Sequence, residues 1–236
     1  MEPALADRVR ELDWYHTIEL RPGLETDGIY DLRPYVHRYR LPERMDGMRA
    51  LDVGTFDGFW AFEMERRGAT VTAIDLDDEA ELDWPATRRP ATFDRRRRGA
   101  GFDIAREALG SGVERRVCSI YGATPERLGT FDLVLCGSVL IHLRDQVLAL
   151  ERIAALCDGL FISVEPYDRL LSLLGLAAAR YRAPREASVV FWEPTLRAWR
   201  QMILTAGFRS VEQRDRFDIH ARPGWKVRHV TQLARK

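Results

Sequence analysis

The 236-residue chain lacks several features that would narrow its function by themselves. It carries no net charge, since 36 Lys and Arg balance 36 Asp and Glu, so no global field draws it to nucleic acid or to an anionic membrane. Its three cysteines are too few for a disulfide framework and fall in apolar segments, which indicates a reduced, cytoplasmic protein. The longest apolar stretch, residues 170–179, is about half the length that spans a bilayer. The first residues show no basic region followed by an apolar core, so we expect neither a signal peptide nor a membrane partner.

Residues 50–75 carry the strongest local signal. An apolar run ends in Asp52, a turn with Gly54 and Gly58 follows, residues 59–67 have a helical pattern, and a β-branched run ends at Asp75. Glycines let the backbone approach a ligand closely, and a carboxylate ending the second strand can accept hydrogen bonds from two ribose hydroxyls. This order predicts half of a nucleoside-binding sheet.

The spacing of the turn bears on which nucleoside it binds. A dinucleotide site needs G-x-G-x-x-G so that amides at the helix start hold a pyrophosphate, whereas this turn is Gly54-x-x-x-Gly58 with Asp57 inside it. A carboxylate in a diphosphate cradle would suffer strong like-charge repulsion. A cofactor with a positive centre and an amino-acid tail tolerates the acid, so the turn disfavours NAD.

Apolar runs alternate with helical patterns from residue 49 onward, and the length suits one α/β domain. This alternation predicts a Rossmann-like, doubly wound, mainly parallel sheet with helices on both faces, whose ligands bind beyond the carboxyl ends of the strands. The expected strands are 49–53, 70–75, 115–119, 131–136, 159–165, 208–213 and 226–232, and the expected helices are 59–67, 102–109, 145–157 and 194–206.

Three segments depart from this rhythm. Residues 1–48, with a short helix over 3–13 and an extended aromatic stretch over 14–20, are expected to form a cap packed on the domain of residues 49–236. Residues 166–192 are interpreted as a lid-like insertion on the ligand side or as a helix packed on the sheet. Residues 85–98, which include the arginine run 95–98, are interpreted as a solvated loop or as a docking patch for RNA or a phosphorylated substrate.

The D-x-G-x-x-x-G of residues 52–58 resembles motif I of the class I S-adenosylmethionine (SAM) dependent methyltransferases. Residues 14–20, 51–69, 73–76, 131–143 and 191–208 are also similar to the group named after tRNA 5-methoxyuridine-34 formation, which includes small-molecule biosynthetic enzymes. The resemblance covers essentially the full chain. It implies a seven-stranded sheet with its last strand antiparallel, SAM as methyl donor and S-adenosylhomocysteine (SAH) as product.

The resemblance also implies cofactor contacts. Asp52 would orient the turn or meet the SAM amino group through water, and Asp75 would bind both ribose hydroxyls. The turn backbone of Gly54, Thr55, Phe56 and Gly58 would meet the carboxypropyl group of SAM. The adenine would be framed by Leu76, Ser119, Ile120 and Tyr121, and the carbonyls of Cys136 and Gly137 would face the SAM amine. The acid that this class often places beside the adenine amino group is absent from residues 119–121.

The catalytic candidates are His142, His16 and Tyr15. A base is needed only when the acceptor must lose a proton, and histidine serves best near neutral pH. His142 is interpreted as a structural helix-start residue or as that base; Ser138 and isoleucine stand where some methyltransferases have magnesium-binding glutamates, so we expect no metal. Tyr15 and His16 are interpreted as ordinary core or as a cover over the acceptor. The expected substrate contacts are Trp14, Glu165, Tyr167 and Trp192.

These observations predict a SAM-dependent methyltransferase that acts on a small, partly apolar acceptor in secondary metabolism. The protein is expected to be a monomer or a homodimer. Two alternatives stay open. One is methylation of the tRNA wobble uridine, with the arginine-rich loop as docking surface, and the other is a protein that binds SAM without catalysis.

Overall fold

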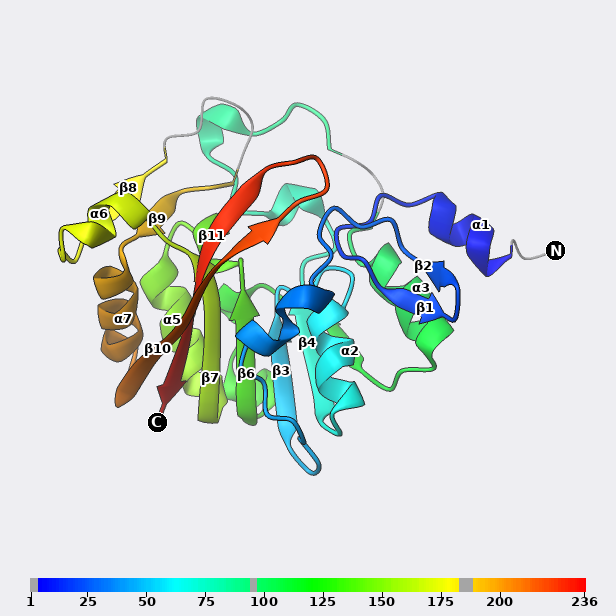
Figure 1. The fold of residues 1–236 in the computed structure, drawn as a ribbon, viewed down its shortest axis with the longest axis horizontal. Helices are drawn as coiled ribbons and strands as arrows, with labels where there is room; N and C mark the ends of the chain where they lie inside the picture. The colour runs from blue at the N-terminus through cyan, green and yellow to red at the C-terminus, as the bar shows by residue number, and fades with distance from the viewer. Residues whose placement is uncertain (1–3, 94–96, 183–188) are drawn as a thin grey trace.

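The computed structural model describes residues 4–93, 97–182 and 189–236. Its main sheet has seven strands in the order β10-β11-β7-β6-β3-β4-β5 (Figure 1). Only β11 runs against its neighbours, pairing antiparallel with both β7 and β10 within the described residues. The strands are β3 (Arg49–Val53), β4 (Thr70–Asp75), β5 (Glu114–Val117), β6 (Phe131–Gly137), β7 (Cys157–Pro166), β10 (Ser210–His220) and β11 (Lys226–Arg235). The predicted sheet and its antiparallel last strand are confirmed.

Helices cover both faces of this sheet because successive strand residues are apolar on opposite sides. One apolar cluster joins Ala50 and Ile162 to α2 and α3, and the other joins Leu51 and Phe161 to α5 and α7. The helices are α1 (Leu5–Arg10), α2 (Phe59–Arg66), α3 (Ala100–Leu109), α4 (Pro125–Leu128), α5 (Gln146–Leu156), α6 (Arg169–Leu173) and α7 (Leu196–Thr205), with 3-10 turns η1 (Arg33–Arg38), η2 (Glu79–Glu81), η3 (Ala86–Arg88), η4 (Ile120–Gly122) and η5 (Leu140–His142). Within the described ranges, every helix is too short or too polar to cross a membrane.

The hairpin of β10 and β11 is longer than the sequence pattern predicts. The expected strand 208–213 in fact runs to His220, past a register shift between Gln213 and Arg216. The charged residues at this shift interrupt the apolar pattern, so the sequence does not predict a strand there. Asp215 is nevertheless only 8% exposed, and its carboxylate is paired with both Arg38 and Arg40. The hairpin therefore extends beyond the carboxyl ends of the neighbouring strands, toward the loops above them (Figure 1).

The N-terminal segment packs against α3 through α1 and β1, and against the hairpin through η1 and Tyr30. Its strands β1 (Glu19–Arg21) and β2 (Leu24–Glu25) pair with each other, and single bridges join His16 to Tyr30 and Tyr30 to Ala221. The expected helix over 3–13 is shorter, at Leu5–Arg10. Tyr15 and His16 are thereby held above the start of α2.

The insertion after β7 contains α6 and a two-stranded ribbon of β8 (Ala179–Tyr181) and β9 (Trp192–Pro194). Helix α6 buries none of its residues. It therefore does not fit the alternative interpretation, a helix packed on the sheet. The Arg180 guanidinium ties the ribbon to Asp168, with Nε 2.8 Å from Oδ2. Residues 183–188 of the predicted lid lie outside the described residues, and closure over a ligand stays a prediction.

Candidate functional site

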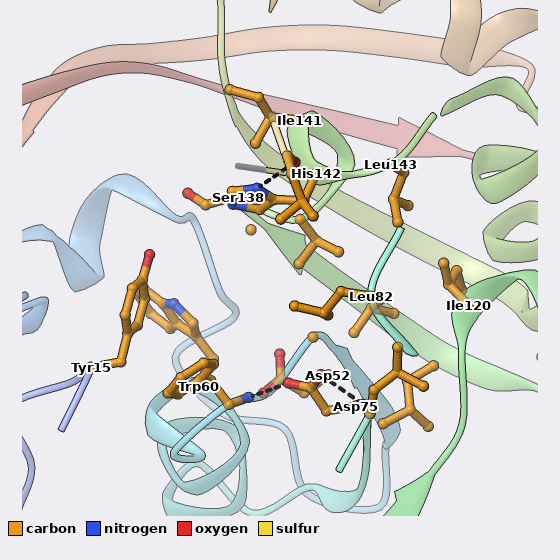
Figure 2. Close-up of a pocket in the computed structure, with 18 of the residues that line it drawn as sticks. Tyr15, Asp52, Trp60, Asp75, Leu82, Ile120, Ser138, Ile141, His142 and Leu143 are labelled. Atoms are coloured by element: carbon orange, nitrogen blue, oxygen red, sulfur yellow. Dashed lines mark hydrogen bonds between the residues drawn. The ribbon is translucent and has the colours of Figure 1, made fainter. Parts of the chain in front are cut away.

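A cavity of about 540 Å³ opens at the carboxyl ends of β3, β4 and β6 (Figure 2). Here the strand order reverses between β3 and β6, the place where doubly wound sheets bind ligands. Figure 2 shows Asp52 and Asp75 at one end, Leu82, Ile120 and Leu143 along one side, and Tyr15, Trp60, Ser138 and His142 around the rest. Predicted site residues that line it are Tyr15, His16, Asp52, Gly54, Phe56, Asp75, Leu76, Ser119, Ile120, Tyr121, Gly137 and His142.

The glycine turn is built as the sequence predicts. Gly54 has φ +74°, and a Cβ there would lie 2.4 Å from Val139 Cγ2, so only glycine fits beneath the start of η5. The Gly54 and Thr55 amides donate to the Ile74 carbonyl at 2.9 and 3.2 Å. Gly58, with φ +94°, precedes α2. The turn is therefore fixed to the end of β4 before any ligand arrives.

Asp75 is held by the two backbone amides that flank the cavity. Its Oδ2 accepts from Phe56 N at 2.8 Å, and its Oδ1 accepts from Leu76 N at 2.7 Å. Each carboxylate oxygen has a further lone pair, so the group can still accept hydrogen bonds from a ligand. This arrangement suits a pair of vicinal hydroxyls.

Asp52 supplies a second acceptor at the same end of the cavity. It is 3% exposed, and its Oδ2 has no partner among the described residues. Burial raises the pKa of Asp52 to about 7, and the negative charge of Asp75 adds to this rise. A buried oxygen without a partner is costly, so a ligand carrying an ammonium or another donor would satisfy it.

The charges lining the cavity are mainly negative. Among the described residues, four carboxylates and one guanidinium line it, from Asp52, Asp75, Glu81, Asp83 and Arg98, and only the Asp83 carboxylate is offset by an arginine outside the lining, Arg144. A diphosphate would be repelled there, whereas the sulfonium and ammonium of SAM would be attracted. The residues present therefore fit SAM.

Asp57 does not have the position that the sequence argument gave it. Its carboxylate faces the N-terminal segment, where Oδ2 accepts from Tyr15 N at 2.7 Å and from His16 N at 2.9 Å. It is 2% exposed, and burial raises its pKa to about 6 although both amides oppose the rise. A diphosphate is consequently disfavoured by Asp52 and Asp75, while Asp57 anchors the cap.

The side framed by η4 contains an acid that the sequence argument missed. Tyr121 Oη donates to Asp83 Oδ2 at 2.9 Å, and Arg144 also donates to this carboxylate through its backbone N at 2.8 Å. Asp83 lies 36 or more residues before the stretch where an acid was sought, so no local spacing could reveal it. Ser119 caps η4 by accepting from Tyr121 N.

Three imidazoles line the other end of the cavity; those of His16 and His229 are buried, and that of His142 is half-buried. Burial lowers the pKa of His16 to about 3, lowers that of His142, and lowers that of His229 to about 4, so all three are neutral at neutral pH. Nδ1 of His142 lies 3.0 Å from the Val189 carbonyl, and Nδ1 of His16 has no partner in the described part of the chain. His229, which carried no sequence signal, lies 2.8 Å from Ser138 Oγ through Nε2.

Several predicted residues lie outside the cavity lining as far as the structure describes it, namely Thr55, Gly58, Cys136, Trp14, Glu165, Tyr167 and Trp192. Trp14 is buried and donates to the Val9 carbonyl, and Trp192 packs on Tyr181. Glu165 is fully buried, and its Oε1 accepts from Val139 N at 3.1 Å and Leu140 N at 3.2 Å. The substrate contacts predicted for Trp14, Glu165, Tyr167 and Trp192 therefore stay predictions, made for side chains that this lining does not include. In the described structure, Glu165 fixes the start of η5, which carries His142.

Of the arginine run 95–98, Arg98 lines the cavity and Arg97 lies outside its lining. Arg95 and Arg96 lie outside the described residues. Arg97 pairs with Asp77 and Asp103. The Arg98 guanidinium lies 4.6 Å from the centre of the Phe56 ring and lines the cavity.

Comparison with known proteins agrees with this geometry. A family model described as "Methyltransferase domain" matches residues 24–213. Ubiquinone biosynthesis O-methyltransferases of Xanthomonas axonopodis pv. citri (strain 306) and Xanthomonas euvesicatoria pv. vesicatoria (strain 85-10) are each 34% identical over 143 residues, which is 58% of this chain and 51% of theirs. The chain thus spans about half the length of the curated relatives it matches.

Two solved structures show the same fold. The N-terminal domain of EvdMO1, crystallised with SAH and D-fucose, has a TM-score of 0.68 at 21% identity and covers 98% of this chain and 95% of that one. The 1,6-didemethyltoxoflavin-N1-methyltransferase of Burkholderia thailandensis, with its namesake ligand and SAH, has a TM-score of 0.53 at 18% identity, covering 81% and 72%. Since the family model matches most of its length, the chain belongs to the methyltransferase domain family.

Proposed function

We propose that this chain is a SAM-dependent methyltransferase whose acceptor is a small, partly apolar molecule. The observation that carries the proposal is a single cavity whose acidic end fits SAM and whose other end is apolar and closed by aromatic side chains. SAM supplies a methyl group on a sulfonium, which departs as a neutral thioether. Holding two reactants in one enclosed cavity provides much of the acceleration of such a transfer.

The chain's own residues would divide the work between the two ends. Asp75 would receive the ribose hydroxyls, and the unpartnered oxygen of Asp52 would face the ammonium. Tyr15 and His16, anchored through Asp57, would cover the acceptor and exclude water. His142, with Nδ1 on the Val189 carbonyl, would present Nε2 to the acceptor.

The aromatic lining of the acceptor end supports a small acceptor. Tyr30, Tyr39, Trp60 and Ile141 line it, and Tyr39 stacks on Trp60 with ring centres 3.7 Å apart. One similar protein is named for O-methylation in ubiquinone biosynthesis, and a structural neighbour is named for methylation of 1,6-didemethyltoxoflavin, a small molecule. For tRNA methylation, the described part of the arginine run offers little, since Arg97 is already paired with two carboxylates.

One labelling experiment separates the three functions. The protein is incubated with methyl-labelled SAM and either a low-molecular-weight metabolite fraction or total tRNA, and SAH binding is measured in parallel by calorimetry. We expect SAH binding and label in the metabolite fraction. Label in tRNA would contradict the small-molecule acceptor and favour the tRNA alternative, and SAH binding without label in either would favour a non-catalytic protein. Tight NADH binding without SAH binding would overturn the proposal altogether.

A further inference from the structure

Ser138 and His229 form a pair inside the cavity, although 91 residues separate them in the sequence. Ser138 follows β6, and His229 lies on β11, opposite Pro166 of β7. Ser138 Oγ and His229 Nε2 are 2.8 Å apart, and both residues line the cavity. The long β10–β11 hairpin brings the imidazole to this position.

The surroundings of His229 decide which atom donates. Its Nδ1 lies 2.9 Å from the Val227 carbonyl, which can only accept, so Nδ1 carries the proton. His229 is 3% exposed and neutral, so its Nε2 has a lone pair and accepts the Ser138 hydroxyl proton. The lone pairs of Ser138 Oγ are then left for a ligand.

The backbone of Ser138 adopts a conformation that non-glycine residues disfavour. Its φ is +57°, a left-handed conformation that costs a non-glycine residue roughly 1–2 kcal/mol. Ser138 N donates to the Val164 carbonyl at 2.9 Å, which fixes the conformation from the adjacent strand. Strained residues of this kind gather at functional sites. Figure 2 shows the Ser138 side chain in the pocket with Tyr15, which extends from the opposite wall.

The pair therefore offers an acceptor to the ligand and no donor. A carboxylate or phosphate on the methyl acceptor would meet lone pairs and be repelled. An ammonium would lose its hydration beside Tyr15, Ile141 and Val190, which also line the cavity. A neutral hydroxyl suits both the lone pairs and the apolar walls.

We propose that Ser138, oriented by His229, determines specificity by accepting a hydrogen bond from a neutral hydroxyl of the methyl acceptor. His229 acts through Ser138 and is a positioning residue. The proposal rests on the proposed function in taking this cavity as the acceptor site. It names the acceptor class as a hydroxyl-bearing, uncharged molecule.

The test compares 4-fluorophenol with 4-fluoroanisole, which differ in the ability to donate one hydrogen bond. Binding is measured by fluorine NMR in the wild-type protein, alone and with saturating SAH. One hydrogen bond is worth about 1 kcal/mol, so we expect the phenol to bind about fivefold more tightly. Ser138→Gly, which suits the positive φ, and His229→Phe should each abolish the preference while leaving anisole binding unchanged. His220→Phe, on the same hairpin but outside the described lining, is the matched control and should keep it.

A second measurement reports on His229 directly. Long-range proton–nitrogen NMR spectra of the wild-type protein should show the Nδ1–H tautomer, and Ser138→Gly should shift the Nε2 resonance. The Nε2–H tautomer, or a phenol affinity no higher than that of anisole, would overturn the proposal. Failure to bind SAH would instead refute the proposed cofactor, while the phenol preference of the protein alone would still decide the role of the pair.

Discussion

Replacing Asp75 with alanine tests the cofactor end of the cavity most directly. The carboxylate accepts from Phe56 N and Leu76 N, at 2.8 and 2.7 Å, and has one further lone pair on each oxygen. If both lone pairs receive ribose hydroxyls, the substitution removes two hydrogen bonds to a charged group, each worth about 1.5–3 kcal/mol. Water replaces part of this loss, so we expect an SAH dissociation constant raised at least tenfold and up to roughly 100-fold.

The same substitution should also reduce stability, because the two amides lose their acceptor. We expect the free energy of unfolding in urea to fall by about 2 kcal/mol. Asp78→Ala is the matched control, since Asp78 lies three residues along and caps only the exposed Ala80 N, at 2.8 Å. It should cost about 1 kcal/mol of stability and leave SAH binding unchanged.

Calorimetric titration with SAH and urea unfolding on the same samples separate the two effects. A tenfold loss of affinity in Asp75→Ala, with the folded fraction unchanged at the assay temperature, would locate the ribose contact at this carboxylate. An unchanged dissociation constant would refute the reasoning, because the ribose acceptor would then lie elsewhere.

Three further predictions follow from the geometry of the cap, the turn and the buried acids. Asp57→Ala leaves the Tyr15 and His16 amides without an acceptor, so the free energy of unfolding should fall by about 2–3 kcal/mol. Asp57→Asn keeps an acceptor oxygen and should lower the free energy of unfolding by less. Equal decreases for the two variants in urea unfolding would contradict this prediction. Gly54→Ala and Gly47→Ala both place a side chain at a φ of +74°, but of these two glycines only Gly54 faces Val139. The free energy of unfolding should therefore be roughly 1–3 kcal/mol lower in Gly54→Ala than in Gly47→Ala. Adding Val139→Ala to Gly54→Ala should restore part of that difference. Burial raises the pKa of Glu165 to about 8, so the folded state holds this proton more tightly than the unfolded state and stability should fall as pH rises toward 8. The histidines with lowered pKa values make stability rise with pH, but only below about pH 6.5. The decrease in the free energy of unfolding should therefore be visible between pH 6.5 and 8 and be smaller in Glu165→Gln. Identical slopes of stability against pH in the wild-type protein and Glu165→Gln would refute the role given to Glu165.

The parts of the site that could be predicted are those with short-range causes. The run from Asp52 to Asp75 contains its strand, turn, helix and second strand in order, so a local pattern was enough to place Gly54 and Asp75 together. Periodicity also placed six of the seven main strands within a few residues of their observed bounds. The exception is β10, where buried Asp215 breaks the apolar alternation and is neutralised by arginines of the N-terminal segment.

The contacts that could not be predicted join distant parts of the chain. Asp57 lies in the recognised turn, but its partners are amides 41 and 42 residues earlier. Asp83 meets Tyr121 across 38 residues, and Ser138 meets His229 across 91. Hydrogen-bond partners depend on the final positions of whole strands and loops, which sequence spacing does not encode.

The sequence by itself thus determined the sheet, its glycine turn and the methyl-donor end of the cavity, because local strand and turn chemistry specifies them. Only the tertiary structure decided what the acceptor end offers. There, a hairpin from the end of the chain and a cap from its beginning meet over β6, and burial leaves their imidazoles neutral.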